Sequence, residues 1–512
     1  MKLAKSLLLV SAACLMARIG ATQAADLPVK AKPVEYVKIC SLYGPGFYYI
    51  PGTDTCIRLS GSLRAQLMVN SNSFSLNPDF GAGGASNRFS NAYTTRAREY
   101  LNIDTRTATE YGVVRTYFQS VFQWASGSYS GQGNGSTVYQ SIGGVSAPNN
   151  ANPGAVAGGT FGLYYAFIQF AGFTFGKADS QFSTPWGEFP GNYGELPGSG
   201  PWDPVNQLTY TADFGQGITV SFSAQDQVQH DTSNIWNIRA ATPAGLATGT
   251  YAGNDIAGTT APDLIAMLRV DQPWGLFQAS VAAHNNHAAY YGATELTGHP
   301  DDKWGWAGQL ALSMKNIPTG PGDSINISGV YANGASRYTF NDYMSSTYAR
   351  YGGTSLAGAY QSVGLAGLSD SVFVPGAGQE LTTTYGFNGA FNHNWDPHWA
   401  SSVFGGFGAV RYDNTAKGYI CNAFVTGLAL SSGIAGCNPD FNYAVVGTKT
   451  SWTPVKNLTF VAELAYSMLD QKYERGSSVT LPLQSGIGKP AAVYKLKDQN
   501  SFTLQLLAQR NF

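Results

Sequence analysis

Apolar and polar residues alternate along much of this chain, which is the period of a strand with one face in each of two environments. In 217–226, Ile218, Val220 and Phe222 alternate with hydroxyl and amide residues, and 457–467 repeats the pattern. The same alternation predicts sixteen strands in all. They are 56–69, 95–107, 112–124, 160–171, 172–178, 205–213, 217–226, 262–271, 275–285, 303–315, 324–333, 382–394, 399–411, 441–452, 457–467 and 493–512.

The connections between these strands differ in length by parity. Short turns lie near 108–111, 214–216, 272–274, 316–323, 395–398 and 453–456. Long segments lie at 70–94, 125–159, 179–204, 227–261, 286–302, 334–381, 412–440 and 468–492. A membrane barrel with tight periplasmic turns and long external loops requires this alternation, whereas a soluble sandwich, such as a secreted adhesin or lectin, does not.

The last segment, 493–512, is an amphipathic strand that ends on an aromatic residue. Phe502, Leu504 and Leu506 share one face with the terminal Phe512. This ending is expected of a barrel that closes its last strand against its first within a lipid layer. It also resembles the C-terminal signal by which bacterial outer-membrane barrels are recognised for insertion.

Composition agrees with a membrane barrel. Only 12% of the 512 residues are charged, against roughly a quarter in soluble domains. No run of 18 apolar residues follows the N-terminal region, so the sequence predicts no transmembrane helix. We therefore expect an all-β fold, a 16-stranded antiparallel transmembrane β-barrel. The net charge of −1 argues against nucleic acid as a partner.

The N-terminus reads as a secretory signal. Lys2 and Lys5 precede an apolar stretch, and small residues up to Ala24 provide a cleavage site. The predicted organisation is a signal peptide at 1–24, a periplasmic pre-barrel segment at 25–55 and a barrel at 56–512.

Tryptophans gather near strand ends. Trp274, Trp395, Trp399 and Trp452 lie at or beside short turns, and Trp124, Trp304 and Trp306 lie at the opposite ends. This placement predicts two aromatic girdles at the membrane interfaces.

Four cysteines follow the signal, and an even number in an exported chain implies disulfides. Cys40 and Cys56 precede or open the first strand, whereas Cys421 and Cys437 lie in the seventh external loop. Cross-pairing would have to bridge an apolar band of ~25 Å, so we expect Cys40–Cys56 and Cys421–Cys437. Metal binding is disfavoured because the sequence has no CxxC motif and no histidine pair near the cysteines.

Several stretches resemble the general porin family of alphaproteobacteria, of the rhizobial and Brucella type. They are Val37–Gly44, Gly46–Cys56, Phe167–Thr174 and the C-terminal strand, and the resemblance covers essentially the whole mature chain. It implies a sixteen-stranded, trimeric diffusion pore in which the third external loop, here 179–204, folds into the lumen. Substrate preference does not carry over, because the other loops show no match.

Arginines occupy the polar face of the first three strands. Arg64, Arg96 and Arg98 lie at the height of the expected constriction, and Arg58, Arg106 and Arg115 lie nearer the periplasmic rim. Such a positive wall, facing carboxylates across a narrow lumen, would produce a transverse field. The alternative is local pairing, for example of Arg106 with Asp104. The carboxylates expected opposite the arginines, on the inserted loop, are Asp179, Glu188, Glu195 and Asp203.

Other functions have weaker support. A substrate-specific porin would use an aromatic slide, to which Trp186 and Trp202 could contribute. An outer-membrane phospholipase or protease would need a Ser–His or Asp–His cluster at one barrel end, which the sequence does not assemble. We interpret the histidines, including His284 and His287, as surface residues rather than metal ligands.

The sequence therefore predicts a non-enzymatic porin, without a cofactor or metal, in the bacterial outer membrane. Its expected partners are outer-membrane lipids and lipopolysaccharide, two further copies of the chain, and small hydrophilic solutes and ions.

Overall fold

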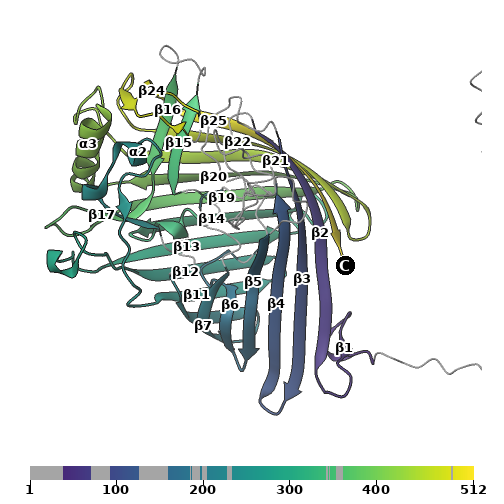
Figure 1. Cartoon of the computed structure of the whole chain (residues 1–512). Helices are drawn as coiled ribbons and strands as arrows, with labels where there is room; N and C mark the ends of the chain where they lie inside the picture. Colours follow the sequence, from purple (N-terminus) through teal and green to yellow (C-terminus); the bar gives the residue numbers. More distant parts are fainter. Residues whose placement is uncertain are drawn as a thin grey trace, which may run out of the picture.

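The computed structural model describes residues 38–70, 93–125, 160–184, 186, 196–198, 204–227, 233–341, 344, 346–352, 361–485 and 488–512. Sixteen antiparallel strands form one closed barrel (Figure 1). These strands are β2 (Cys56–Asn70), β3 (Thr94–Thr109), β4 (Gly112–Ala125), β5 (Thr160–Phe170), β6 (Phe173–Asp179), β7 (Pro204–Asp213), β8 (Ile218–Gln225), β11 (Asp263–Gln272), β12 (Gly275–Asn286), β13 (Lys303–Lys315), β14 (Ser324–Asn333), β19 (Thr383–Asn394), β20 (Trp399–Arg411), β21 (Phe441–Val455), β22 (Leu458–Gln471) and β25 (Gln499–Asn511).

The strands obey the alternation on which the sequence prediction rested. Phe222 is 63% exposed on the outer face, while its neighbours Ser221 and Ser223 are buried on the inner face. The tryptophans predicted for the girdles are exposed at Trp274, Trp399 and Trp304, as expected at membrane interfaces. Among the described residues, no helix has both the length and the apolar character needed to cross a membrane.

The barrel closes between its first and last strands. Residues Ser62 to Asn70 of β2 pair with Asn511 to Thr503 of β25. Beyond this ladder, the backbones of Gly61 and Phe512 exchange two hydrogen bonds of 3.0 Å. The last strand is shorter than expected, because Lys497 and Asp498 interrupt the predicted strand 493–512. Its first part is the separate β24 (Ala492–Leu496), which belongs to another sheet.

The long connections carry elements that the alternation did not predict. One additional sheet contains β9 (Asn234–Asn237), β10 (Gly253–Asn254), β17 (Ser369–Phe373) and β18 (Glu380–Leu381), and the other contains β15 (Thr347–Gly352), β16 (Ser362–Gly367), β23 (Ser478–Leu481) and β24. The helices are α2 (Pro243–Leu246), α3 (Asn414–Leu428) and the short 3-10 turns η1 (Ser41–Tyr43), η2 (Ile238–Ala240), η3 (Glu295–Thr297) and η4 (Ser336–Tyr338).

These elements gather at the barrel end with the long loops, which we call the cap (Figure 1). Trp236, Tyr251 and Phe424 come from different loops and are fully buried there. Their rings contact one another at centroid distances of 4.8 and 5.2 Å. The long loops therefore share one hydrophobic core.

The opposite end has the short turns and a hairpin formed by residues 38–55, which we call the pre-barrel hairpin. Its strand β1 (Tyr48–Tyr49) pairs with the start of β2, and Phe47 is buried beside Cys40 and Cys56. The division into 1–24, 25–55 and 56–512 stays a prediction, and residues 1–37 lie outside the described part of the chain.

Candidate functional site: the inner wall of the barrel

Three arginines form an upper group on the inner face of β2 and β3. Arg64 and Arg98 are directly opposite each other in the ladder, and Arg96 is opposite Gln66. Amide oxygens hold them, since Arg64 donates to Gln509 at 2.8 Å and Arg98 to Gln123 at 2.9 Å. Each guanidinium keeps its positive charge at physiological pH, so this part of the wall is basic.

A second trio, the rim group, lies nearer the short-turn end of the same strands. Arg106 and Arg115 each place Nη2 3.1 Å from Oδ2 of Asp104, and Nη2 of Arg58 lies 3.7 Å from that oxygen. The local pairing considered for Arg106 is therefore present, and it extends to all three arginines.

Aromatic rings line the wall beside both groups. The guanidinium of Arg98 lies 5.4 Å from the ring centre of Tyr100, and that of Arg115 lies 5.2 Å from Tyr117. Cation–π contacts of this kind stabilise an arginine side chain in one orientation. The sequence gave no sign of these rings as a set, because they come from different strands.

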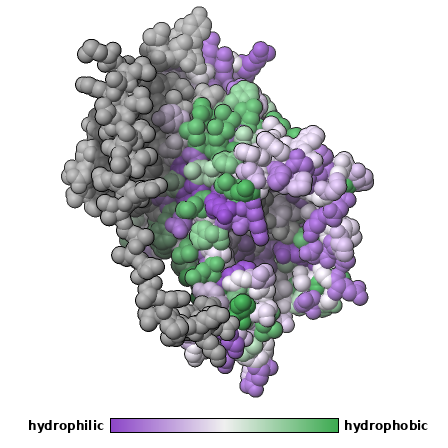
Figure 2. Space-filling model, turned by 90° about the vertical axis from the view of Figure 1, so that its right-hand side faces the viewer, coloured by the Kyte–Doolittle hydropathy of each residue, from purple (hydrophilic) through white to green (hydrophobic). Residues whose placement is uncertain are grey.

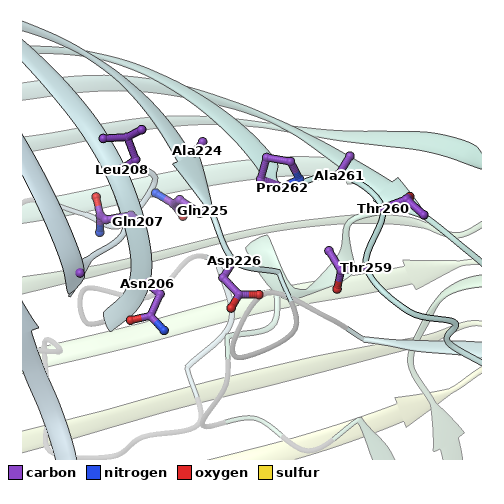
Figure 3. Close-up of a pocket in the computed structure, with 11 residues that line it drawn as sticks. Asn206, Gln207, Leu208, Ala224, Gln225, Asp226, Thr259, Thr260, Ala261 and Pro262 are labelled. Carbon is purple, nitrogen blue, oxygen red and sulfur yellow. The ribbon is translucent and has the colours of Figure 1, made fainter.

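The segment 179–204 leaves the wall at the end of β6. Gln207 Nε2 donates to the carbonyl oxygens of Ala178 and Asp179, at 2.7 and 2.8 Å, and Ser180 Oγ donates to Gln225 Oε1 at 2.8 Å. Gln207 and Gln225 also line an open pocket of about 520 Å³ at the ends of β7 and β8 (Figure 3). These amides are occupied with the backbone that turns away, so the pocket marks where the loop departs.

The next residues of the segment lie against the inner face of the wall. Gln278 Nε2 of β12 donates to the carbonyl oxygen of Ser183 at 2.8 Å, and Ser280 Oγ donates to that of Gln181 at 3.2 Å. Phe182 is 2% exposed and its ring centre lies 4.5 Å from that of Tyr338.

The described residues near the other end of the segment, Leu196 to Gly198, contact a different part of the wall. Ser328 Oγ and Asn388 Nδ2 donate to the carbonyl oxygen of Gly198, at 2.8 and 3.0 Å. Gly198 has φ +99°, and a Cβ atom there would lie 2.4 Å from the backbone carbon of Phe387. Glycine is required because the backbone approaches the wall so closely.

Of the expected loop carboxylates, Asp179 is among the described residues, and its Oδ1 accepts a hydrogen bond of 2.7 Å from Tyr165. Glu188, Glu195 and Asp203 lie outside them, as does Trp202 of the aromatic slide considered from the sequence. The view onto the short-turn end shows hydrophilic residues around a hollow (Figure 2).

A barrel with a polar inner wall and a loop bonded to it matches a known family. The model of the porin subfamily matches residues 26–505. The chain belongs to the porin family. This porin is 33% identical over 270 residues to porin Omp2a of Brucella ovis, an alignment covering 51% of this chain and 70% of the relative. It is 29% identical over 324 residues to porin Omp2b of Brucella abortus, covering 60% and 78%.

A solved structure shares the fold. The outer-membrane channel DcaP of Acinetobacter baumannii superimposes with a TM-score of 0.54 at 15% identity, covering 91% of this porin and 99% of that channel. The predicted fold class and the expected family are thus confirmed. The chain is an outer-membrane β-barrel that forms a passive diffusion channel, and its family consists of channels rather than enzymes.

Both predicted disulfides are present in this porin. Cys40 is bonded to Cys56, with Cα atoms 6.0 Å apart, and Cys421 is bonded to Cys437, at 5.7 Å. The first ties the pre-barrel hairpin to the start of β2. The second joins α3 to the residues that follow it.

The interpretation of His284 as a surface residue is wrong. It is 2% exposed, with Nδ1 2.8 Å from Asp263 and Nε2 3.7 Å from Asp370. This is an Asp–His cluster at one barrel end, but a substrate has no access to it because all three side chains are buried. His287 is half-buried and bonded to Asp302 at 2.6 Å. Among the described residues, no group of three or more His, Cys, Asp or Glu side chains is arranged to hold a metal ion.

Proposed function

We propose that this porin is narrowed between the segment 179–204 and the upper arginine group, Arg64, Arg96 and Arg98. Small hydrophilic solutes and ions pass through this constriction, and its fixed charges set the ion preference. Arginines on the wall raise the local concentration of anions, and carboxylates on the loop raise that of cations.

The observation that carries the proposal is that the segment is bonded to the inner wall near both of its ends. Ser183 is held by β12, and Gly198 is held by β14 and β19. A chain anchored at these two places must run through the lumen between them. Asp179 supplies one lumenal carboxylate, and Glu188, Glu195 and Asp203 are proposed to supply the others.

We also propose that three copies associate, with lipid and lipopolysaccharide around them. The family resemblance implies a trimer, and the outward face of the first strands offers an apolar surface for it. Leu63, Phe122 and Phe161 are 54%, 45% and 61% exposed there. Native mass spectrometry after gentle detergent extraction should give the trimer mass, and a monomer alone would contradict this assignment.

The constriction is tested by reversal potentials in planar bilayers under a KCl gradient at low salt. Neutralising Arg64, Arg96 and Arg98 to glutamine should shift the preference toward cations, and Glu188→Gln with Glu195→Gln should shift it toward anions. Both shifts should shrink at 1 M salt, where the Debye length falls to about 3 Å.

The matched control is Arg475→Gln, which removes an exposed arginine from a turn of the cap and should leave the reversal potential unchanged. If neither set of lumenal substitutions changes the potential, the constriction lies elsewhere in the barrel. The fold and the passive channel would then still stand, and the assignment of 179–204 would not.

A further inference from the structure

The rim group has more positive charge than its local pairing requires. Arg58, Arg106 and Arg115 lie within salt-bridge distance of one carboxylate, that of Asp104. Among the described residues, no other carboxylate lies that close to these three arginines, so the group has a net charge of two positive units. Arg106 and Arg115 are also directly opposite each other across β3 and β4, a like-charge pairing that destabilises a sheet.

The arginines face the lumen, whereas their shared carboxylate does not. Asp104 is 2% exposed, but the side chains of Arg58, Arg106 and Arg115 are 39%, 26% and 28% exposed. A guanidinium carries five N–H donors in a planar fork suited to carboxylate and phosphate oxygens. An anion in the lumen can therefore reach donors that Asp104 does not use.

The rim group is separate from the proposed constriction. Arg58 and Arg64 are six positions apart on one face of β2, which corresponds to about 20 Å at the usual rise of an extended strand. Uncharged side chains fill the interval, where Gln119 donates to Asn102 at 2.7 Å and Asn102 to Ser60 at 3.5 Å. The wall therefore has two basic zones with a neutral zone between them.

The pre-barrel hairpin fixes the rim group in place. The Phe47 ring centre lies 5.0 Å from the Arg58 guanidinium and 4.9 Å from that of Arg106. Tyr43 lies 5.6 Å from Arg106. Two polar atoms at this site, Arg58 Nε and Tyr43 Oη, are buried and have no hydrogen-bond partner among the described residues. Such atoms are costly unless something bonds to them.

We propose that Arg58, Arg106 and Arg115 form a binding site for a multivalent oxyanion at the periplasmic mouth of the pore. A phosphate group carries the charge that matches the net positive charge of the site, and it has several oxygens to accept hydrogen bonds from adjacent guanidiniums. This inference deepens the proposed function, on which it rests, by naming a class of solute that pauses on its way through the channel.

The competing explanation is that the arginines only anchor the hairpin through their contacts with Phe47 and Tyr43. The two roles differ in what Asp104→Asn does. Removing the carboxylate raises the positive potential, so an oxyanion site should bind its ligand more tightly. A purely structural cluster loses its central acceptor and gains no affinity for an anion.

The experiment measures chloride current through the full-length porin in planar bilayers while inorganic phosphate is added at constant ionic strength. We expect phosphate to reduce the current in a saturable manner, more strongly from the periplasmic side. Arg115→Gln should weaken the block by about tenfold or more, the usual effect of losing a charge-assisted hydrogen bond. Asp104→Asn should strengthen it.

The matched control is Arg269→Gln, which removes a lumenal arginine of β11 that is bonded to Gln278 at 3.0 Å. It should leave phosphate block unchanged. Equal weakening by Arg269→Gln and Arg115→Gln, or absence of block in the native porin, would overturn the proposal. Arg115→Lys keeps the charge without the fork and serves as the variant if Arg115→Gln does not fold, and it should show weaker block than the native protein.

Two further arms separate the outcomes. Succinate in place of phosphate tests whether the site takes any dianion, and block by succinate alone would contradict the phosphate assignment. If the constriction variants fail to move the reversal potential while phosphate block persists, the proposed constriction fails and the oxyanion site stands. If the constriction variants behave as expected without phosphate block, the reverse holds.

Discussion

His284 Nδ1 lies 2.8 Å from Oδ1 of Asp263, and both side chains are buried where β11 and β12 meet the cap. The other oxygen of Asp263 accepts a hydrogen bond of 2.6 Å from Tyr338, which belongs to a long loop. On the far side of the imidazole, Asp370 accepts hydrogen bonds from the backbone N–H groups of Ser233 and Ser336. This histidine therefore links two barrel strands to two loops of the cap.

We expect His284→Ala to loosen the cap. Without the imidazole, the buried carboxylates of Asp263 and Asp370 lose a shared partner, and breaking a buried pair typically costs about 3 to 5 kcal/mol. Thermal unfolding in detergent should therefore begin at a lower temperature, and limited proteolysis should cut the long loops sooner. His287→Ala, which removes the half-buried pair with Asp302, is the control. Equal effects of the two variants would refute the linking role of His284.

Gly61→Ala should hinder closure of the barrel. A Cβ atom at this position would lie 2.3 Å from the backbone oxygen of Tyr100 and 2.6 Å from the ring of Phe512. The backbone oxygen cannot move without disturbing the β2–β3 ladder, so we expect a loss of about 1 to 3 kcal/mol, as for overpacked sites. The measurement is the folded fraction after refolding, read from the heat-dependent shift in gel mobility.

Gly378→Ala is the matched control for this prediction. A Cβ atom there meets nothing within 4 Å, so the folded fraction should stay within the range of a neutral surface change, about 0.5 kcal/mol. A Gly61→Ala barrel that refolds as well as Gly378→Ala would show that the seam tolerates the extra methyl group.

The barrel was predictable from the sequence because each strand separates two environments, and this is recorded locally as alternation. The prediction failed at 493–512, where the alternation ran through Lys497 and Asp498 and hid a change of sheet. Helix α3 was missed although Ile420, Phe424 and Leu428 are spaced as on one helical face. That signal lay inside a connection in which no regular element was sought.

The site was predictable only in part. The positions of the arginines followed from strand parity, and the pairing of Arg106 with Asp104 followed from their proximity in sequence. The burial of His284 was not predictable, because Asp370 and Tyr338 come from loops far along the chain. Long-range packing of this kind leaves no periodic trace at the histidine itself.

Stability should depend on the ionisation of Asp323, in the short turn before β14. Burial alone would raise the pKa of this carboxyl, but hydrogen bonds from Thr319, the Asn394 backbone N–H and His393 outweigh it and lower the pKa from 3.8 to about 2. A lowered pKa contributes stability that is present above the unfolded value and lost as pH falls through the folded one. Asp323→Asn should therefore unfold at a lower temperature than the native porin at pH 5, and the difference should shrink toward pH 2.

Thr319→Val provides the graded control. It removes one of the donors to Asp323, at 2.6 Å, and should reduce the same pH-dependent stability without abolishing it. A gap between native porin and Asp323→Asn that is the same at pH 5 and pH 2 would count against the hydrogen-bonded carboxylate as its cause.

The seam between β2 and β25 also determines when the barrel can be completed. Arg64 and Gln509, which are bonded across it, are separated by 445 positions, while most neighbouring strands in the barrel are close in sequence. Every hairpin can therefore form from local contacts, but the ring cannot close until the last strand has arrived. Until then the chain presents two unpaired strand edges, which are templates for pairing with other chains. The terminal strand thus acts as the step that commits an exported chain to a closed barrel.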